Sequence, residues 1–306
     1  MTPELPHDAL WPRAGAWPSP DGRGAADLAL IGVPTWRTSL SPTGAHATPA
    51  AVREALRRYS PALVGTADGA AVDLGELRVV DHGDVDEPDG PEGEARARAA
   101  VAAAVADARS LVALGGDNAL TVPVALGAWG DDVATAGLVT IDAHHDLRDG
   151  VSNGSPVRRL VEAGLDPRRT VQIGIADFAN SAAYARRAED LGITVVHLDD
   201  LRGRDLAGVM HEALDVAGAA GGPVHLDVDV DVCDRSVAPG CPASVPGGLA
   251  AWELRALVRA AAADRRLRSV DVAEVDANAD APDGRTVRLA ALCVLEVLAG
   301  LARREG

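Results

Sequence analysis

Short apolar segments that end in acidic or glycine residues alternate along this chain with longer segments rich in Ala, Leu and Arg. The short segments have the length of buried strands, and the longer ones repeat their apolar residues with the period of a helix. This alternation predicts a parallel sheet with helices on both faces. We therefore expect an α/β fold, namely a three-layer αβα sandwich around a central eight-stranded parallel sheet.

The expected elements cover most of the chain. Residues 1–25 carry repeated Pro and Gly without periodicity, which indicates an irregular arm, and residues 26–306 are expected to form a single domain. The expected strands lie within 28–34, 77–85, 110–117, 137–146, 170–177, 194–200, 223–232 and 268–276. The expected helices lie within 49–59, 93–108, 181–192, 250–264 and 286–304.

Acidic residues gather where the expected strands end. In open parallel sheets ligands bind at the carboxyl ends of the strands, so this edge is the expected place of the functional site. The residues concerned are Asp117, Asp142, Asp177, Asp199, Asp229 and Glu274.

Charge and composition exclude several classes of function. The formal net charge is -16, which disfavours nucleic acid as a partner and favours a small cationic ligand. All positively charged side chains apart from histidine are Arg, so a Schiff-base lysine and a phosphate loop of the Walker type are both excluded. Three cysteines and the absence of a signal-like or membrane-spanning segment predict a cytoplasmic protein without a membrane anchor.

The stretch DAHHD, residues 142–146, combines carboxylates and histidines at the end of an apolar strand. On an extended chain Asp142, His144 and Asp146 point to one side, because side chains alternate with period two. His145 falls on the opposite side, where a packed or supporting role is expected. A cluster delivered by a buried strand favours a metal site over a solvated acidic turn.

A second acidic cluster, DVDVD at 227–231, alternates with Val. If Asp227, Asp229 and Asp231 share one face of a buried strand, a cation is needed to offset their repulsion. Carboxylates with few histidines and no cysteine favour Mn²⁺ among the common divalent ions. Two ions about 3.5 Å apart are plausible with this many ligands.

The motifs LGGDN, DAHHD, DVDVCDRSVAPG and DVAEVDANAD occur in the order and spacing typical of ureohydrolases, the binuclear manganese family that includes arginase, agmatinase and formimidoylglutamase. The resemblance covers roughly residues 27 to 300. It implies that Asp142 and Asp229 bridge two Mn²⁺ ions. It places Asp146 and Asn118 in one site, and His144 and Asp231 in the other.

Asn118 departs from the family pattern, which has His at this position. An amide oxygen is a weaker donor than imidazole toward first-row ions, so we expect weaker binding in the site that contains Asn118. The resemblance also assigns Asp146 to proton transfer and Glu274 to holding the cationic substrate in a bidentate pair. Alternatively, Glu274 caps a strand end or pairs with Arg288.

The substrate is less well defined than the family. Asn153 replaces the histidine of arginases, and the NGSPVR segment with Ser155 resembles formimidoylglutamases. Arg148 and Arg158 could bind two substrate carboxylates, although Arg158 could equally open a solvated helix. The favoured reaction is hydrolysis of N-formimidoyl-L-glutamate to L-glutamate and formamide.

Two alternatives to formimidoylglutamate hydrolysis remain open. The first is a guanidino-compound hydrolase, because the segment PGGL resembles agmatinases, which release urea. The second is a non-catalytic relative with a weakened metal site. The resemblance also implies a homo-oligomer, a trimer or hexamer. No role is assigned to Asp227 or to the cysteines beyond packing.

Overall fold

The computed structural model describes residues 7–64 and 71–304. Its centre is an eight-stranded sheet in which every pair of neighbouring strands is parallel, as the sequence predicts. Across the sheet the strands are β4 (Val79–Asp84), β1 (Ala26–Val33), β5 (Ala108–Gly115), β10 (Leu267–Ala273), β9 (Val224–Asp229), β6 (Gly137–Ile141), β7 (Thr170–Ile175) and β8 (Thr194–His197).

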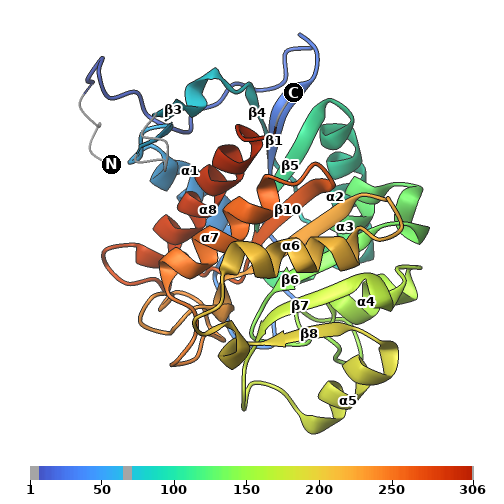
Figure 1. Ribbon diagram of the computed structural model, residues 1–306. Coiled ribbons are helices and arrows are strands. Elements are labelled where there is room, and N and C mark those ends of the chain that lie inside the picture. The colour runs from blue at the N-terminus through green and yellow to red at the C-terminus, as the bar shows by residue number, and fades with distance from the viewer. Residues whose placement is uncertain (1–6, 65–70, 305–306) are drawn as a thin grey trace.

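Helices cover both faces of this sheet (Figure 1). One layer contains α1 (Thr48–Leu56), α6 (Leu206–Ala217), α7 (Ala251–Ala262) and α8 (Arg285–Leu301). The other contains α2 (Gly90–Ala106), α3 (Thr121–Trp129), α4 (Pro156–Glu162) and α5 (Ala182–Leu191). The three-layer αβα sandwich is thus confirmed.

Helices α3 and α6 and one small sheet were not predicted, and α4 was expected only as the alternative place of Arg158. Helix α3 is apolar on nearly every side, because it is buried between the sheet and its neighbours, and so it shows no amphipathic period. Helix α4 spans only seven residues. The amphipathic α6 was overlooked. Strands β2 (Ala62–Leu63) and β3 (Val72–Asp73) form a separate antiparallel pair of two residues each.

Aliphatic side chains make up the core on both faces of the sheet. Nearly every residue of β1, β5 and β9 is buried, which is the usual state of strands covered on two sides by helices. Gly116, just after β5, packs so tightly that a Cβ there would lie 2.0 Å from the carbonyl oxygen of Thr35. Only glycine allows this close approach, which fixes the path of the chain into Asp117 and Asn118.

The order of the strands places the acidic residues side by side. Strands β5, β10, β9 and β6 are neighbours in the middle of the sheet, and all four end at the same edge. Asn118, Glu274, Asp231 and Asp142 follow these strands within three residues of their ends. Residues that are up to 156 positions apart, such as Asn118 and Glu274, therefore meet there.

The described part of the N-terminal arm, residues 7–25, forms no helix or strand, and β1 begins at Ala26. Residues 1–6 of the expected arm and 305–306 of the expected domain lie outside the described residues. The domain boundary after residue 25 therefore stays a prediction. In the described chain, none of the helices is both long and apolar enough to cross a membrane.

Candidate metal centre and active site

A cavity of about 310 Å³ opens at the carboxyl edge of the sheet. Its floor is acidic, and its wall comes from loops that follow β1, β6 and β7. The floor residues are His144, Asp146, Asp229, Asp231 and Glu274, together with Asp142, which does not itself line the cavity but offers a ligand atom within 4.8 Å of those of His144 and Asp231. The wall includes Leu40, Ser41, His145, Leu147, Arg148, Asn153, Gly154, Ala179, Asn180, Ser181, Tyr184 and Ala243.

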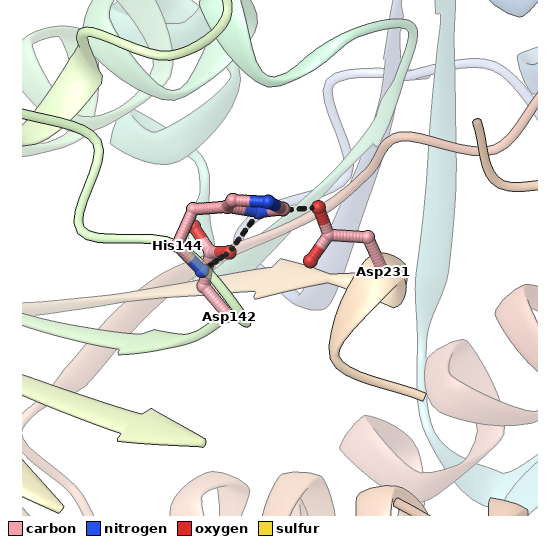
Figure 2. A group of neighbouring side chains, drawn as sticks. All are labelled: Asp142, His144 and Asp231. Carbon is pink, nitrogen blue, oxygen red and sulfur yellow. Dashed lines mark hydrogen bonds and ion pairs between the residues drawn. The ribbon is translucent and has the colours of Figure 1, made fainter. Parts of the chain in front are cut away.

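Three side chains on this floor are placed to share one cation. Asp142, His144 and Asp231 each offer a ligand atom, and these atoms lie within 4.8 Å of one another. His144 Nδ1 lies 2.8 Å from Asp231 Oδ2 and 3.4 Å from Asp142 Oδ1 (Figure 2). Asp142 Oδ2 is buried and has no hydrogen-bond partner among the described residues. An unsatisfied carboxylate oxygen in such a group is what a metal ligand requires before the ion binds.

The electrostatics of the floor call for positive charge. Burial, followed by repulsion from neighbouring carboxylates, raises the pKa of Asp142 and Asp229 well above the usual value. Burial raises the pKa of Asp146 to about 7. Although burial alone would lower the pKa of His144, attraction by Asp231 and Asp142 raises it to about 12. The direction of this shift indicates that the group favours positive charge, which a bound metal ion would supply in place of a proton on His144.

The two carboxylates after Val228 do not lie on one strand. Strand β9 ends at Asp229, and Asp231 belongs to a short 3-10 helix, η7 (Val230–Val232). Asp229 Oδ1 accepts a hydrogen bond from the backbone N–H of Asp231 at 2.8 Å. The expectation of three carboxylates on one strand face is thus wrong for Asp231, because the turn and not strand alternation carries it into the cavity.

Asp227 lies deeper, within the sheet. It is completely buried, opposite Asp271 of β10 and Thr140 of β6, and neither of its carboxylate oxygens has a hydrogen-bond partner among the described residues. It does not line the cavity. Its position agrees with the choice of Asp229 and Asp231, and not Asp227, as the expected ligands.

Two floor residues have unusual backbone conformations. Asp146 has φ +52° and Glu274 has φ +62°, the left-handed region that non-glycine residues rarely adopt. Each such residue costs of order 1 kcal/mol or more, and it persists only where the surrounding structure imposes it. Here the carboxylates of both residues are buried and hydrogen-bonded, so the strained backbone accompanies a fixed side-chain position.

Asn118 reaches the acidic floor through its amide nitrogen. Asn118 Nδ2 donates to Asp146 Oδ2 at 2.7 Å, whereas Asn118 Oδ1 accepts from the hydroxyl of Thr121 at 2.8 Å. The oxygen that would coordinate a metal ion is therefore turned toward Thr121. The side chain would have to rotate for Asn118 to act as the expected ligand.

Glu274, a further carboxylate of the floor, accepts hydrogen bonds from the protein at one of its two oxygens. Glu274 Oε1 accepts from the backbone N–H of Asn118 at 2.7 Å and from Asn153 Nδ2 at 2.8 Å. Burial raises the pKa of Glu274 to about 8, with repulsion from Asp117 as the next cause. The alternative pairing with Arg288 is not observed, because the structure gives Glu274 these two partners instead.

The expected substrate-binding residues separate into two groups. Arg148 and Asn153 line the cavity, and within the described chain the guanidinium of Arg148 makes no hydrogen bond or ion pair, although its charge lowers the pKa of Asp146. Arg158 lies outside it: its guanidinium donates to the carbonyl oxygens of Arg148 and Gly150 and pairs with Glu162. Its place is that of a residue that stabilises a loop and the start of a helix.

Ser155 also lies outside the cavity. It is completely buried, and its hydroxyl donates to the carbonyl oxygen of Ser152 at 2.8 Å and accepts from the N–H of Ser152. This closes the turn that precedes α4. The position of Ser155 therefore supports a role in shaping the 152–155 turn and gives no contact to a substrate.

His145 packs beside the group formed by Asp142, His144 and Asp231, which agrees with the packed or supporting role expected for it. Its Nδ1 lies 2.7 Å from Gln172 Oε1, while Gln172 Nε2 donates to the carbonyl oxygen of His145 at 2.8 Å. Gln172, a polar residue inside the buried strand β7, was the sequence signal for this contact. Burial lowers the pKa of His145, so this ring tends to be neutral.

Sequence reasoning missed the wall formed by residues 179–184. Asn180 and Ser181, from the segment between β7 and α5, and Tyr184, in the first turn of α5, line the cavity. Arg187 of α5 lies over the Tyr184 ring at 5.3 Å and donates to the carbonyl oxygen of Leu147, which joins this wall to the loop after β6. The signal was present, because this segment too follows the carboxyl end of a strand.

Comparison with known proteins agrees with this geometry. A protein of Halalkalibacterium halodurans named formimidoylglutamase is 33% identical over 289 residues, which cover 92% of this chain and 89% of that protein. The crystal structure of formimidoylglutamase from Bacillus subtilis has a TM-score of 0.87 at 30% identity and covers 98% of this chain and 95% of that one. A Trypanosoma cruzi formiminoglutamase solved with Mn²⁺ shares the fold, with a TM-score of 0.81 at 24% identity and coverage of 92% and 95%. The sequence model of the arginase family matches residues 26–300, and the chain therefore belongs to the arginase family.

Proposed function

We propose that this protein hydrolyses a linear amidine C–N bond and that its substrate is N-formimidoyl-L-glutamate, which would yield L-glutamate and formamide. The observation that carries the proposal is a cavity with a buried acidic floor and, on its wall, Arg148, whose guanidinium has no hydrogen bond or ion pair with another described residue. The floor suits a cationic amidinium and the arginine suits a carboxylate. The relatives named formimidoylglutamase, which match most of this chain, support the same substrate.

We propose Mn²⁺ as the cofactor, with two ions per subunit and weaker binding beside Asn118. The donors on the floor are carboxylates, one imidazole and one amide, a set that suits Mn²⁺. Asp142 Oδ2, which has no hydrogen-bond partner among the described residues, and the raised pKa of His144 both indicate a place for positive charge. When bound, such ions supply a water molecule acidic enough to act as a nucleophile at neutral pH.

The chain's own residues would orient the substrate and move a proton. Glu274 faces the cavity and would hold an N–H of the amidinium. Asp146 lines the cavity among the proposed ligands, where its carboxylate would accept a proton and pass it to the leaving amine. Asp142, His144, Asp146, Asp229 and Asp231 would serve as ligands, together with Asn118 once its side chain has rotated.

Arg148 would bind a carboxylate of the substrate. We expect Arg148→Ala to raise KM for formimidoylglutamate about 10-fold to 100-fold with a small change in kcat, because a charge-assisted contact made in both ground and transition states is lost. Arg158→Ala is the matched control, since Arg158 is used by backbone carbonyls and Glu162. Equal increases in KM for the two variants, measured by steady-state kinetics, would argue against a carboxylate site at Arg148.

A turnover screen with metal analysis on the same sample tests the proposed reaction. Purified protein loaded with Mn²⁺ should release formamide from formimidoylglutamate. A panel in which only agmatine or other guanidino compounds react, giving urea, would reject this substrate and support the alternative of a guanidino hydrolase. No turnover of any amidine by a metal-loaded sample would leave a non-catalytic relative as the better description.

We further propose that the chain from residue 26 onward forms one catalytic domain, preceded by an arm. We propose that the protein is a homo-oligomer of three or six subunits. We also propose a cytoplasmic location, for which the three buried free cysteines, Cys233, Cys241 and Cys293, offer support. Size-exclusion chromatography with light scattering would measure the oligomer.

A further inference from the structure

The side chain of Asn153 connects two parts of the cavity wall. Its Nδ2 donates to Glu274 Oε1 at 2.8 Å, and its Oδ1 accepts from the backbone N–H of Leu40 at 3.0 Å. Its own backbone N–H donates to the carbonyl oxygen of Thr38 at 3.4 Å. Because both ends of the amide are engaged by the protein, Asn153 is better placed to position Glu274 than to bind a substrate itself.

The contact from Asn153 changes what Glu274 can offer to a ligand. Glu274 Oε1 already accepts two hydrogen bonds, from the N–H of Asn118 and from Asn153, and these use the two lone-pair directions of that oxygen. Within the described chain no hydrogen bond reaches Oε2, and Glu274 lines the cavity. One carboxylate oxygen, and not two, is thus available to the substrate, in contrast to the bidentate pair expected from sequence.

The number of free acceptors bears on the choice between two kinds of cation. An N-alkylguanidinium has five N–H donors, whereas an N-alkylformamidinium has three, because a C–H replaces one NH₂ group. A donor that is buried without an acceptor costs about 1–3 kcal/mol. A floor with a single free oxygen at Glu274 therefore suits the cation with fewer donors.

We propose that Asn153 is a specificity-determining positioning residue, which favours a formamidinium over a guanidinium group by occupying one oxygen of Glu274. The inference rests on the proposed function, because it concerns the orientation of an amidine in the same cavity. It explains the preference for a formamidinium group by a contact within this chain. The expected metal ligands alone do not explain that preference.

The test compares two substrates that differ in a single group. These are N-formimidoyl-L-glutamate and its guanidino analogue with the same glutamate tail. In Asn153→Ala the freed lone pair of Glu274 can accept an N–H of the guanidinium. We expect the ratio of kcat/KM for the two compounds to move about tenfold toward the guanidino compound. If its turnover is too slow to measure, its inhibition constant against formimidoylglutamate gives the same ratio.

A second variant separates the contact with Glu274 from the contact with Leu40. Asn153→Asp keeps an oxygen to accept from the N–H of Leu40 and, when assayed at a pH at which both carboxyl groups are ionised, removes the donor to Glu274. The added charge acts on two substrates of equal charge, so it largely cancels in the ratio. Both variants should shift the ratio in the same direction, and thermal unfolding checks that each is folded.

The outcomes distinguish this inference from the proposed function. Wild-type turnover with an unchanged ratio in both variants would overturn the role of Asn153 and leave the proposed function intact. A shift in Asn153→Ala alone would assign the effect to the loop at Leu40 and would also overturn it. A wild-type protein that hydrolyses neither compound and binds neither would remove the proposed function and this inference together.

Discussion

The acidic floor has two halves that neutralise their charge in different ways. In the first, His144 lies between Asp142 and Asp231, and it lowers the pKa of Asp231 although burial alone would raise it. In the second, burial raises the pKa of Asp146 to about 7, although the charge of His144 and the hydrogen bond from the amide of Asn118 both lower it. The charge of His144 compensates Asp231, its partner at 2.8 Å, whereas Asp142 in the same half and Asp146 beside the amide keep raised pKa values.

The two halves also differ in how well their ligand atoms are arranged to bind an ion. The histidine half has three ligand atoms already within 4.8 Å of one another. In the amide half, Asn118 points its nitrogen at Asp146 and its oxygen at Thr121. We therefore expect the histidine half to bind a divalent ion first and the amide half to fill at higher concentration.

The largest effect is expected in the histidine half. Asp231→Asn removes a buried carboxylate from the three-residue group and the partner of His144, so we expect kcat/KM to fall about a thousandfold or more together with the bound metal. Activity and elemental analysis on the same preparation provide the measurement. Asp200→Asn, a change at an exposed carboxylate outside the cavity, is the control. Retention of a full complement of metal in Asp231→Asn would show that this half is not the primary site.

A smaller effect is expected in the amide half. Asn118→His replaces a weak neutral donor by imidazole, and we expect the affinity of the second ion to rise about tenfold. Titration of the metal-free protein with Mn²⁺, followed by calorimetry, gives the two affinities. Thr121→Ala, which removes the hydroxyl that holds Asn118 Oδ1, should raise the same affinity to a lesser degree. Two equal, tight sites in the unmodified protein would contradict the contrast between the halves.

The smallest effect concerns pH. The pKa values of Asp146 and Asp142 are raised in the folded state, so their contribution to stability is greatest below the unfolded pKa near 4 and is lost as pH rises toward 7. The Tm of the metal-free protein should fall by about 5 °C between pH 5 and pH 8. The gain in Tm from Mn²⁺ should increase over the same range, because the ligands must be deprotonated to bind. Scanning calorimetry checks both trends, and Asp146→Asn should flatten the first.

Much of the fold could be predicted because it depends on periodicity. The central strands were visible as apolar segments, since strands covered on both faces need apolar residues throughout, and the edge strands β4 and β8 each kept a short apolar stretch. Helix α3 was not visible, because a helix buried on nearly every side has no polar stripe to mark its period. The order of the strands was also beyond reach, as no local pattern states which strands are neighbours.

For the candidate site, it was easier to predict which residues take part than what each of them contacts. DAHHD and DVDVD pointed to the acidic floor, but the 3-10 turn that carries Asp231 depends on a backbone contact with Asp229. Arg158 and Arg148 have the same side chain, and only the surrounding carbonyl oxygens show that the first is occupied. The roles of such residues follow from tertiary contacts, which sequence spacing does not encode.

The position of β10 has a consequence for the order in which the molecule can be completed. Leu267–Ala273 lies between β5 and β9, so β4, β1 and β5 on one side meet β9, β6, β7 and β8 on the other only through the strand that is synthesised last. Until that strand is inserted, two partial sheets expose unpaired edges of the kind that promote aggregation. Asn118 and Glu274 are brought together by the same event. Maturation of the catalytic cavity should thus coincide with closure of the sheet, late in folding.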